Sequence, residues 1–216
     1  MKFSAFIPIK LHSERIPNKN FYNLNGKPLF YYIFNTLMRI NHIDEIVVNT
    51  DSNEVESRIK KYFKNINFIL REESLSSPLE SVNKLIASNI NHIKNDCIIQ
   101  THVTNPLLSY DSINKSLEQY IKNKKPIFSV NALQTRLYDS KLDPINHDLS
   151  VLLPTQSLEP VYEENSNFYI FSKKQFIEND YNRIGKSSEI FKTSKSESID
   201  IDNFDDLHLV EKLISS

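Results

Sequence analysis

Short runs of apolar residues alternate along the chain with segments in which apolar residues recur every three or four positions. The short runs predict strands over residues 3–9, 45–50, 67–70, 96–101, 126–131, 167–171, 188–193 and 198–202. The segments with helical spacing predict helices. One begins after Pro28 and one after Ser52, and four more lie at residues 79–93, 111–121, 173–179 and 204–214. Because strands that alternate with helices of this length form βαβ units, we expect an α/β fold with a doubly wound, mostly parallel sheet.

Residues 132–165 interrupt this alternation. They contain short apolar pieces and prolines without a clear helical stripe, so we interpret them as an inserted hairpin or arm. The remaining chain shows no internal repeat and no low-complexity linker, and a length of 216 residues suits one domain. We therefore expect a single domain over residues 1–216, with an arm within 132–165.

Composition narrows the classes of function. A net charge of −1 gives no general attraction to nucleic acid or to a membrane surface, so any basic site must be local. The only two glycines, Gly26 and Gly185, exclude both the G-x-G-x-x-G motif and the P-loop. The single cysteine, Cys97, excludes an internal disulfide, and its apolar strand pattern favours a buried structural thiol. No apolar run is long enough to span a bilayer, and we expect a cytoplasmic protein without nucleic-acid or membrane partners.

A basic loop, residues 10–20, follows the first predicted strand and precedes a helix. It carries Lys10, His12, Ser13, Arg15 and Lys19. Backbone N–H groups and cationic side chains at the carboxyl end of a strand are typical phosphate ligands in α/β proteins. We therefore hypothesise that the basic loop binds a nucleoside triphosphate; the alternative is a solvated basic turn above the sheet.

Two aspartates near the carboxyl terminus are candidate metal ligands. Asp200 and Asp202 alternate with Ile199 and Ile201. On a strand, positions i and i+2 point to one face, so both carboxylates can meet one cation while the isoleucines enter the core. Mg²⁺ prefers one or two carboxylates together with waters and phosphate oxygens. The alternative is a polar strand end that caps the following helix.

Other polar residues lie at the ends of predicted strands. Arg71 follows the strand at 67–70, where a guanidinium can face a base edge or a carboxylate, although an exposed surface arginine is the competing interpretation. Gln100, Thr104 and Asn105 belong to a polar turn after the strand at 96–101, and Asn165 precedes the strand at 167–171. Such turns often line ligands, but ordinary loops share their composition.

Together these residues resemble a known family. Residues 7–20, I-P-I-K-L-H-S-E-R-I-P-N-K-N, resemble the motif I-P-A-R-x-x-S-K-R-I-P-x-K-N of the acylneuraminate (CMP-sialic acid, or nonulosonic acid) cytidylyltransferases. Further matches, in the family's order and spacing, are residues 26–29, 49–52, 71–73, 100, 105–107 and 199–202. The resemblance covers nearly the whole chain, and the P-x-K-N ending is closer to the acylneuraminate branch than to the KDO cytidylyltransferases.

The resemblance implies a Rossmann-like nucleotidyltransferase fold and a homodimer whose dimerisation arm comes from residues 132–165. It implies that the anomeric hydroxyl of an acidic, sialic acid-like sugar attacks the α-phosphate of CTP, releases pyrophosphate and yields a CMP-sugar for a bacterial surface glycan. Such a transfer needs charge neutralisation and in-line positioning more than a covalent nucleophile.

The resemblance also assigns roles to individual residues. It implies catalytic roles for Lys10, Lys19, Asp200 and Asp202, of which the two aspartates would hold Mg²⁺. The implied nucleotide contacts are Lys10, His12, Ser13, Arg15, Lys19, Arg71 and Gln100. The implied acceptor contacts are Gln100, Thr104, Asn105 and Asn165.

The chain departs from the family pattern in ways that leave the acceptor open. Lys10 stands where the family has arginine, which keeps the charge and loses the bidentate fork, and Leu11-His12 replace a glycine-containing pair. Thr155 and Glu163 occupy positions where the family supplies arginines. The alternatives are a nucleotidyltransferase for another NTP or acceptor, and a catalytically silent nucleotide- or sugar-binding homologue. The retained aspartates and loop cations argue against the silent homologue.

Overall fold

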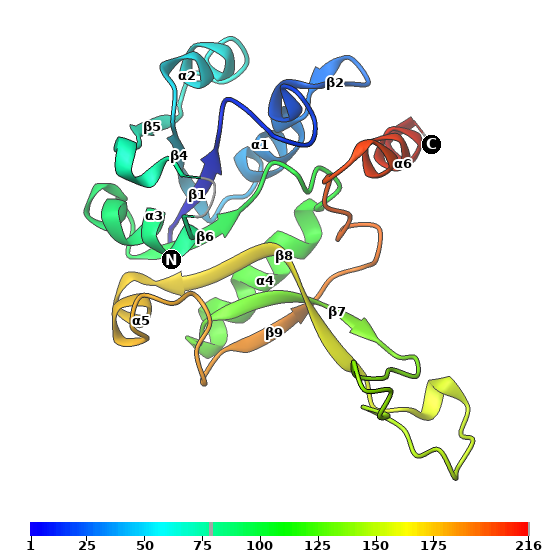
Figure 1. Ribbon diagram of the computed structural model, residues 1–216. Helices are drawn as coiled ribbons and strands as arrows, with labels where there is room; N and C mark the ends of the chain where they lie inside the picture. The colour runs from blue at the N-terminus through cyan, green and yellow to red at the C-terminus, as the bar shows by residue number, and fades with distance from the viewer. Residues whose placement is uncertain (78–79, 216) are drawn as a thin grey trace.

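The first strand, β1 (Phe3–Ile9), runs through the middle of a seven-stranded sheet of order β5-β4-β1-β6-β8-β7-β9. The computed structural model describes residues 1–77 and 80–215. Strands β4 (Ile43–Thr50) and β6 (Cys97–Thr101) flank β1 in parallel, and β5 (Asn67–Leu70) extends the parallel half. Figure 1 shows this half of the sheet in blue to green.

The other half of the sheet is mixed. Strand β8 (Val161–Ser172) lies antiparallel to both β6 and β7 (Ile127–Leu133), whereas β9 (Glu189–Lys192) lies parallel to β7. Four of the six pairings are parallel, so the prediction of a mostly parallel sheet is confirmed. A separate two-stranded ribbon, β2 (Asn23–Leu24) and β3 (Lys27–Pro28), turns at Asn25 and Gly26, both of which have positive φ.

Helices cover both faces of the sheet, as a doubly wound fold requires. Helices α1 (Phe30–Met38), α2 (Asn53–Ile59) and α4 (Tyr110–Asn123) pack on one face. Helices α3 (Val82–Asn89) and α5 (Lys173–Glu178) pack on the other. Short 3₁₀ turns lie at Lys19–Phe21, Glu73–Leu75, Ile90–His92 and Thr155–Ser157. The predicted start of a helix at Leu79 lies outside the described residues.

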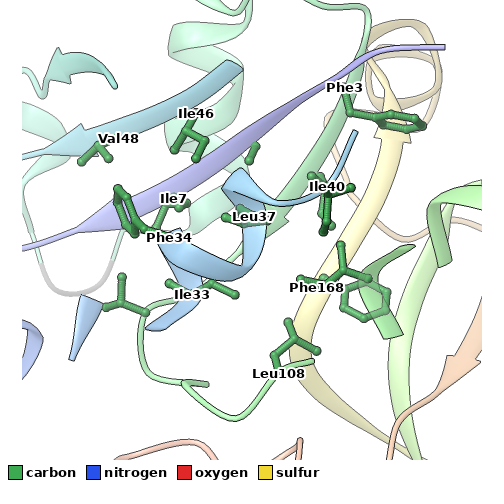
Figure 2. Packing of buried hydrophobic residues seen from close by; sticks show 14 of the residues in the cluster. Phe3, Ile7, Ile33, Phe34, Leu37, Ile40, Ile46, Val48, Leu108 and Phe168 are labelled. Atoms are coloured by element: carbon green, nitrogen blue, oxygen red, sulfur yellow. The ribbon is translucent and has the colours of Figure 1, made fainter. Parts of the chain in front are cut away.

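The strand β1 is buried on both faces because its side chains alternate between two cores. Ile7 belongs to the core beneath α1, and Phe6 belongs to the core beneath α3. Figure 2 shows Phe34 of α1 packed close to Ile7 and to Val48 of β4. Cys97 is also buried, as its apolar pattern predicted.

The predicted strand at 198–202 is wrong. These residues form an irregular connection to α6 (Phe204–Ser215), and the Ile201 N–H donates to the Thr104 carbonyl at 2.9 Å in the loop after β6. Among the described residues, the segment pairs with no strand and contacts the loops that follow β1 and β6, since the Ile201 carbonyl also accepts a hydrogen bond from Lys19 Nζ. Ile201 is nevertheless fully buried, in a third cluster with residues of α6 and Ile16 of the basic loop. Ile199, Asp200 and Asp202 are only partly buried, so the apolar signal at Ile201 reports the burial of one side chain and not a strand.

Residues 134–160 leave the sheet between β7 and β8 and project from the body of the molecule (Figure 1). Internal hydrogen bonds shape this segment, since Arg136 Nη2 donates to the Leu153 carbonyl at 2.6 Å and Asn146 Nδ2 donates to the Thr135 carbonyl at 2.8 Å. Several of its apolar side chains are exposed to solvent, among them Leu142 at 78% and Leu152 at 86% exposure, whereas Leu158 is buried.

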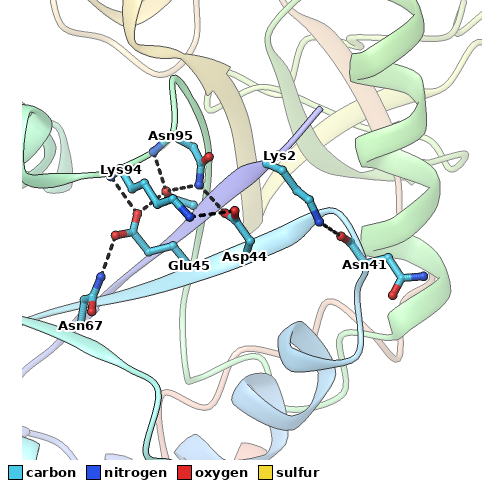
Figure 3. Close-up of polar contacts among 8 residues, drawn as sticks. Lys2, Asn41, Asp44, Glu45, Asn67, Lys94 and Asn95 are labelled. Atoms are coloured by element: carbon cyan, nitrogen blue, oxygen red, sulfur yellow. Dashed lines mark hydrogen bonds and ion pairs between the residues drawn. The ribbon is translucent and has the colours of Figure 1, made fainter.

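A buried polar network connects the amino-terminal ends of several strands (Figure 3). The basic loop follows the carboxyl end of β1, so the network lies at the other end of the strands. The Glu45 carboxylate, on β4, accepts hydrogen bonds from the Ser4 hydroxyl, from the Lys94 N–H at 2.9 Å and from Asn67 Nδ2 at 2.7 Å. Glu45 and Ser4 are both buried. One carboxylate therefore joins β1, β4, β5 and the loop before β6.

Replacing Glu45 by alanine should lower the free energy of unfolding by about 2–4 kcal/mol, because it leaves buried donors without acceptors. Chemical denaturation of the two proteins measures the difference. The neighbouring Asp44 is exposed, so Asp44→Ala is the matched control and should change stability by less than about 1 kcal/mol. Equal effects of the two substitutions would contradict a structural role for the network.

Candidate functional site

The basic loop borders an open cavity of about 820 Å³ at the carboxyl end of β1. All five side chains singled out in the loop line this cavity, together with residues from three other segments. The lining residues are Lys10, His12, Ser13, Glu14, Arg15, Lys19, Asn20, Asp51, Ser76 and His102. The structure thus places the phosphate ligands predicted from the sequence around one cavity.

Neighbouring segments hold the loop in place. The Leu11 N–H donates to Asp51 Oδ1 at 2.8 Å, and Asn20 Nδ2 donates to the Lys10 carbonyl at 2.8 Å. Ile16 is buried against α6, which anchors the middle of the loop. Ser52 caps α2, whereas the side chain of the preceding Asp51 accepts a hydrogen bond from the basic loop.

Lys10 reaches across the cavity to the segment after β5. Its Nζ donates to the Ser76 carbonyl at 3.1 Å and to the Ser77 carbonyl at 3.0 Å. Partial burial lowers the pKa of the Lys10 ammonium, and the Arg71 charge lowers it further. The charge is therefore held by neutral carbonyl oxygens, which an anion can replace.

Lys19 and Arg15 both approach Asp202. Lys19 is only 8% exposed, and its Nζ donates to the Ile201 carbonyl at 2.6 Å while lying 3.6 Å from Asp202 Oδ1. Arg15 Nη2 lies 2.6 Å from the same oxygen, but its side chain is largely exposed. Lys19 is thus fixed by the backbone, whereas Arg15 is free to move toward a ligand.

Asp200 lies two residues before Asp202, and one of its two carboxylate oxygens is unsatisfied. Among the described residues, Asp200 Oδ1 is buried without a hydrogen-bond partner. Burial raises the pKa of Asp200, and the Asp202 charge raises it further despite a hydrogen bond with the Thr104 side chain. An orphaned oxygen next to a second carboxylate fits the donor set that Mg²⁺ uses with phosphate ligands. No group of three His, Cys, Asp or Glu side chains suited to a metal occurs in residues 1–77 and 80–215.

Arg71 is buried, which excludes the exposed surface arginine. Its Nε donates to Asn49 Oδ1 and its Nη2 donates to the Asn49 carbonyl at 3.0 Å. Arg71 does not line the cavity, although its charge acts on Lys10.

Gln100 is fully buried and lies between His102, which lines the cavity, and Arg183. Its Nε2 lies 2.9 Å from His102 Nε2, and its Oε1 accepts a hydrogen bond from Arg183 Nη1. His102 lines the cavity, so the Gln100 side chain lies directly behind the cavity wall. Arg183 carried no signal in the sequence, because it sits in an irregular segment between α5 and β9.

The remaining predicted acceptor residues do not line the cavity. Asn165 Nδ2 donates to Thr193 Oγ1 at 2.7 Å and to Asn131 Oδ1 at 3.0 Å, so it joins β8 to its neighbours. Thr104 contributes its carbonyl to the segment at Ile201. Asn105 is buried, and both polar atoms of its amide lack partners among the described residues.

His102 should make stability depend on pH. Desolvation, with smaller contributions from the Arg183 and Lys19 charges, lowers the pKa of His102 to about 4. An imidazole with a lowered pKa contributes stability that is complete above its unfolded pKa of about 6.5 and is lost as the pH falls toward the folded value. Between pH 7.5 and 5.5, the wild type should lose about 1 kcal/mol more unfolding free energy than His102→Gln, as measured by denaturant titration. Parallel pH dependences would contradict this assignment.

A strand, a cation-rich loop and a cavity at the carboxyl end of a parallel sheet are the arrangement in which α/β proteins bind nucleotides. The chain belongs to the cytidylyltransferase family, whose model matches residues 4–213. The family membership confirms the class of enzyme that the sequence motif implied.

Relatives with assigned names match over almost the whole chain. A CMP-N,N'-diacetyllegionaminic acid synthase of Legionella pneumophila is 28% identical, covering 99% of this chain and 97% of its own. A pseudaminic acid cytidylyltransferase of Campylobacter jejuni is 26% identical, covering 99% and 96%.

Solved structures share the fold. A CMP:2-keto-3-deoxy-manno-octonic acid synthetase complexed with CTP superimposes with a TM-score of 0.71 at 13% identity, covering 100% of this chain and 99% of its own. A 4-diphosphocytidyl-2C-methyl-D-erythritol synthase of Anaerococcus prevotii has the same TM-score at 12% identity, covering 100% and 99%. Among the described residues, no helix has both the length and the apolar character needed to cross a bilayer.

Proposed function

We propose that the protein transfers CMP from CTP to the anomeric hydroxyl of an acidic, sialic acid-like sugar and releases pyrophosphate. The observation that carries the proposal is the convergence of Lys10, Arg15 and Lys19 on one cavity at the carboxyl end of β1. Family membership supports CTP as the nucleotide. The names of the two relatives support an acid as the acceptor, since one contains N,N'-diacetyllegionaminic acid and the other pseudaminic acid.

The cations of the basic loop would bind the triphosphate. Lys10 exchanges its carbonyl contacts for phosphate oxygens, and Lys19 remains anchored to the Ile201 carbonyl as a fixed positive charge. Arg15, the most exposed of the three, leaves Asp202 and closes over the phosphates. These residues fix the α-phosphate for in-line attack and neutralise the charge of the departing pyrophosphate.

Asp200 and Asp202 would hold Mg²⁺, which when bound neutralises charge on the triphosphate. The departure of Arg15 frees Asp202 Oδ1 for this role, and Asp200 Oδ1 already lacks a partner. Triphosphate binding and cation binding are thereby coupled, because the phosphates take Arg15 and the cation takes the carboxylate that Arg15 releases.

The proposed nucleotide preference is tested by measuring pyrophosphate release with CTP, UTP, dTTP, ATP and GTP in the presence of legionaminic, pseudaminic or 3-deoxy-manno-octulosonic acid. We expect release that requires CTP, Mg²⁺ and one of the acids. Turnover with UTP or dTTP but not with CTP would overturn the cytidylyl assignment. Binding of a nucleotide without turnover of any NTP would favour a silent homologue.

The protein would act as a homodimer in the cytoplasm, where CTP is available. The projecting segment within residues 132–165 exposes Leu142, Leu149 and Leu152, a concentration of apolar surface that a second copy can cover. Light scattering after size exclusion should therefore give the mass of a dimer.

The double substitution Leu149→Asp with Leu152→Asp should convert this dimer to a monomer, because it places charges in an apolar interface. Leu209→Asp, at an exposed leucine on α6, is the control and should leave the dimer intact. A wild-type monomer, or a dimer that survives the double substitution, would contradict the proposed arm.

A further inference from the structure

His102 is an imidazole whose tautomer is set by the residue behind it. Gln100 Oε1 accepts a hydrogen bond from Arg183 Nη1, and Gln100 Nε2 donates to the Thr101 carbonyl at 3.1 Å. Because an arginine only donates and a carbonyl only accepts, these two contacts fix the orientation of the Gln100 amide. The second hydrogen of the amide is left for His102 Nε2, which lies 2.9 Å from Gln100 Nε2. His102 Nε2 is therefore an acceptor, and the proton of the ring is on Nδ1.

The ring is neutral at pH 7. Desolvation, with the charges of Arg183 and Lys19, lowers the pKa of His102 to about 4. The imidazole thus has one N–H, on Nδ1, and one lone pair, on Nε2, which the Gln100 amide occupies. His102 cannot act as a general base without breaking that hydrogen bond. It is a neutral donor whose direction is set before a ligand binds.

The Nδ1–H of His102 is directed to no acceptor in the described part of the chain. The hydrogen bond with Gln100 is the only one that the His102 side chain makes with those residues. The ring is partly exposed, and it lines the cavity that the basic loop borders. Its remaining donor is therefore available to a ligand in that cavity.

His102 lies on the side of the cavity that contains the two carboxylates. Its loop contacts their segment, since the Thr104 carbonyl accepts a hydrogen bond from the Ile201 N–H at 2.9 Å. The Lys19 charge, which is held at the Ile201 carbonyl, also acts on the His102 ring. Lys10 reaches the other way, to the segment after β5. A phosphate that contacts both Lys19 and His102 would therefore lie at the reacting end of the nucleotide.

We propose that His102 donates its Nδ1–H to a non-bridging oxygen of the α-phosphate and stabilises the negative charge that develops there during transfer. A neutral imidazole serves this purpose because it donates a hydrogen bond without exchanging a proton with the phosphate. Gln100 is the positioning residue that holds the tautomer. This inference rests on the proposed transfer of CMP from CTP.

The first test determines the tautomer directly. In ¹⁵N NMR spectra of histidine-labelled protein at pH 7, the protonated nitrogen of His102 should be Nδ1. Addition of CTP and Mg²⁺ without an acceptor sugar should shift this N–H resonance. A proton on Nε2, or an Nδ1–H that does not respond to bound CTP, would overturn the proposal.

The second test compares two amides at position 102. His102→Asn places an N–H donor close to the position of Nδ1, whereas His102→Gln places its amide near Nε2. His102→Gln should lower kcat by about 10²-fold, and His102→Asn should stay within about ten-fold of the wild type. His92→Gln, at an exposed histidine, is the matched control and should behave as wild type. Equal losses in the two variants at position 102 would contradict a donor at Nδ1.

The third test identifies the phosphate. In the two isomers of CTP that carry sulfur at a non-bridging position of the α-phosphate, a different oxygen is replaced in each. Sulfur is the weaker acceptor, so with one isomer the wild type and His102→Gln should differ by less than about three-fold in kcat. Equal losses on CTP and on both isomers would assign His102 a structural role and overturn the proposal.

The outcomes also distinguish this inference from the function on which it rests. A wild type that forms the CMP-sugar, with a His102→Gln variant of unchanged kcat, would overturn the role of His102 and leave the proposed function standing. A wild type that transfers CMP to none of the acids would overturn both.

Discussion

Asp202→Asn should abolish Mg²⁺-dependent turnover, with a loss of about 10³-fold or more in kcat, while the fold stays intact. The substitution removes the negative charge that faces Arg15 and Lys19 and that would share a cation with Asp200. A neutral amide is a far weaker Mg²⁺ ligand than a carboxylate. Rates measured across a Mg²⁺ titration, together with a thermal melt, test the expectation.

The matched control for Asp202→Asn is Asp205→Asn. Asp205 is an exposed residue in the first turn of α6, so this variant loses the same charge close to the site without touching the basic loop. We expect wild-type rates from the control. Wild-type activity in Asp202→Asn itself would refute a metal role for that carboxylate.

Lys19→Met should lower kcat with CTP by about 10²–10³-fold, the second largest effect that we expect. Lys19 is the most buried cation of the cavity, and its bond to the Ile201 carbonyl holds the charge in place before substrate binds. A preorganised charge costs no rearrangement when negative charge develops on the leaving pyrophosphate. Methionine keeps roughly the length of the aliphatic stem and removes the ammonium group, with its charge and its hydrogen bond to the Ile201 carbonyl.

The control for Lys19→Met is Lys64→Met, which removes an exposed lysine after α2. Single-turnover rates at saturating CTP separate the chemical step from nucleotide binding. An unchanged single-turnover rate in Lys19→Met, with only the KM for CTP raised, would show that Lys19 binds the ground state and does not act on the transition state.

Much of the fold could be predicted because the signals are local. The alternation of β1 between two cores and the stripe of α1 follow from sequence spacing alone. The antiparallel direction of β8 could not be predicted from an apolar run, since the run carries no information on direction. The segment at 198–202 shows the same limit, because the burial of Ile201 does not reveal whether a neighbouring strand is present.

The candidate site, like the fold, could be predicted from the sequence only in part. The cations of the basic loop are consecutive in the sequence, so a single motif indicates them, and the structure places them around one cavity. His102 lies within the polar turn after β6, where the sequence alone does not distinguish it from its polar neighbours. Arg183 depends on contacts with Asn83 and Gln100, which are 100 and 83 residues away in sequence, and no local pattern records such partners.

The most direct test of the proposed function is to identify the product. Purified protein is incubated with CTP, Mg²⁺ and legionaminic or pseudaminic acid, and the mixture is analysed by mass spectrometry and ³¹P NMR. We expect one phosphodiester that joins CMP to the sugar, formed in equal amount to the released pyrophosphate. Pyrophosphate accompanied by free CMP, or no incorporation of CMP into any acid, would contradict the proposed transfer.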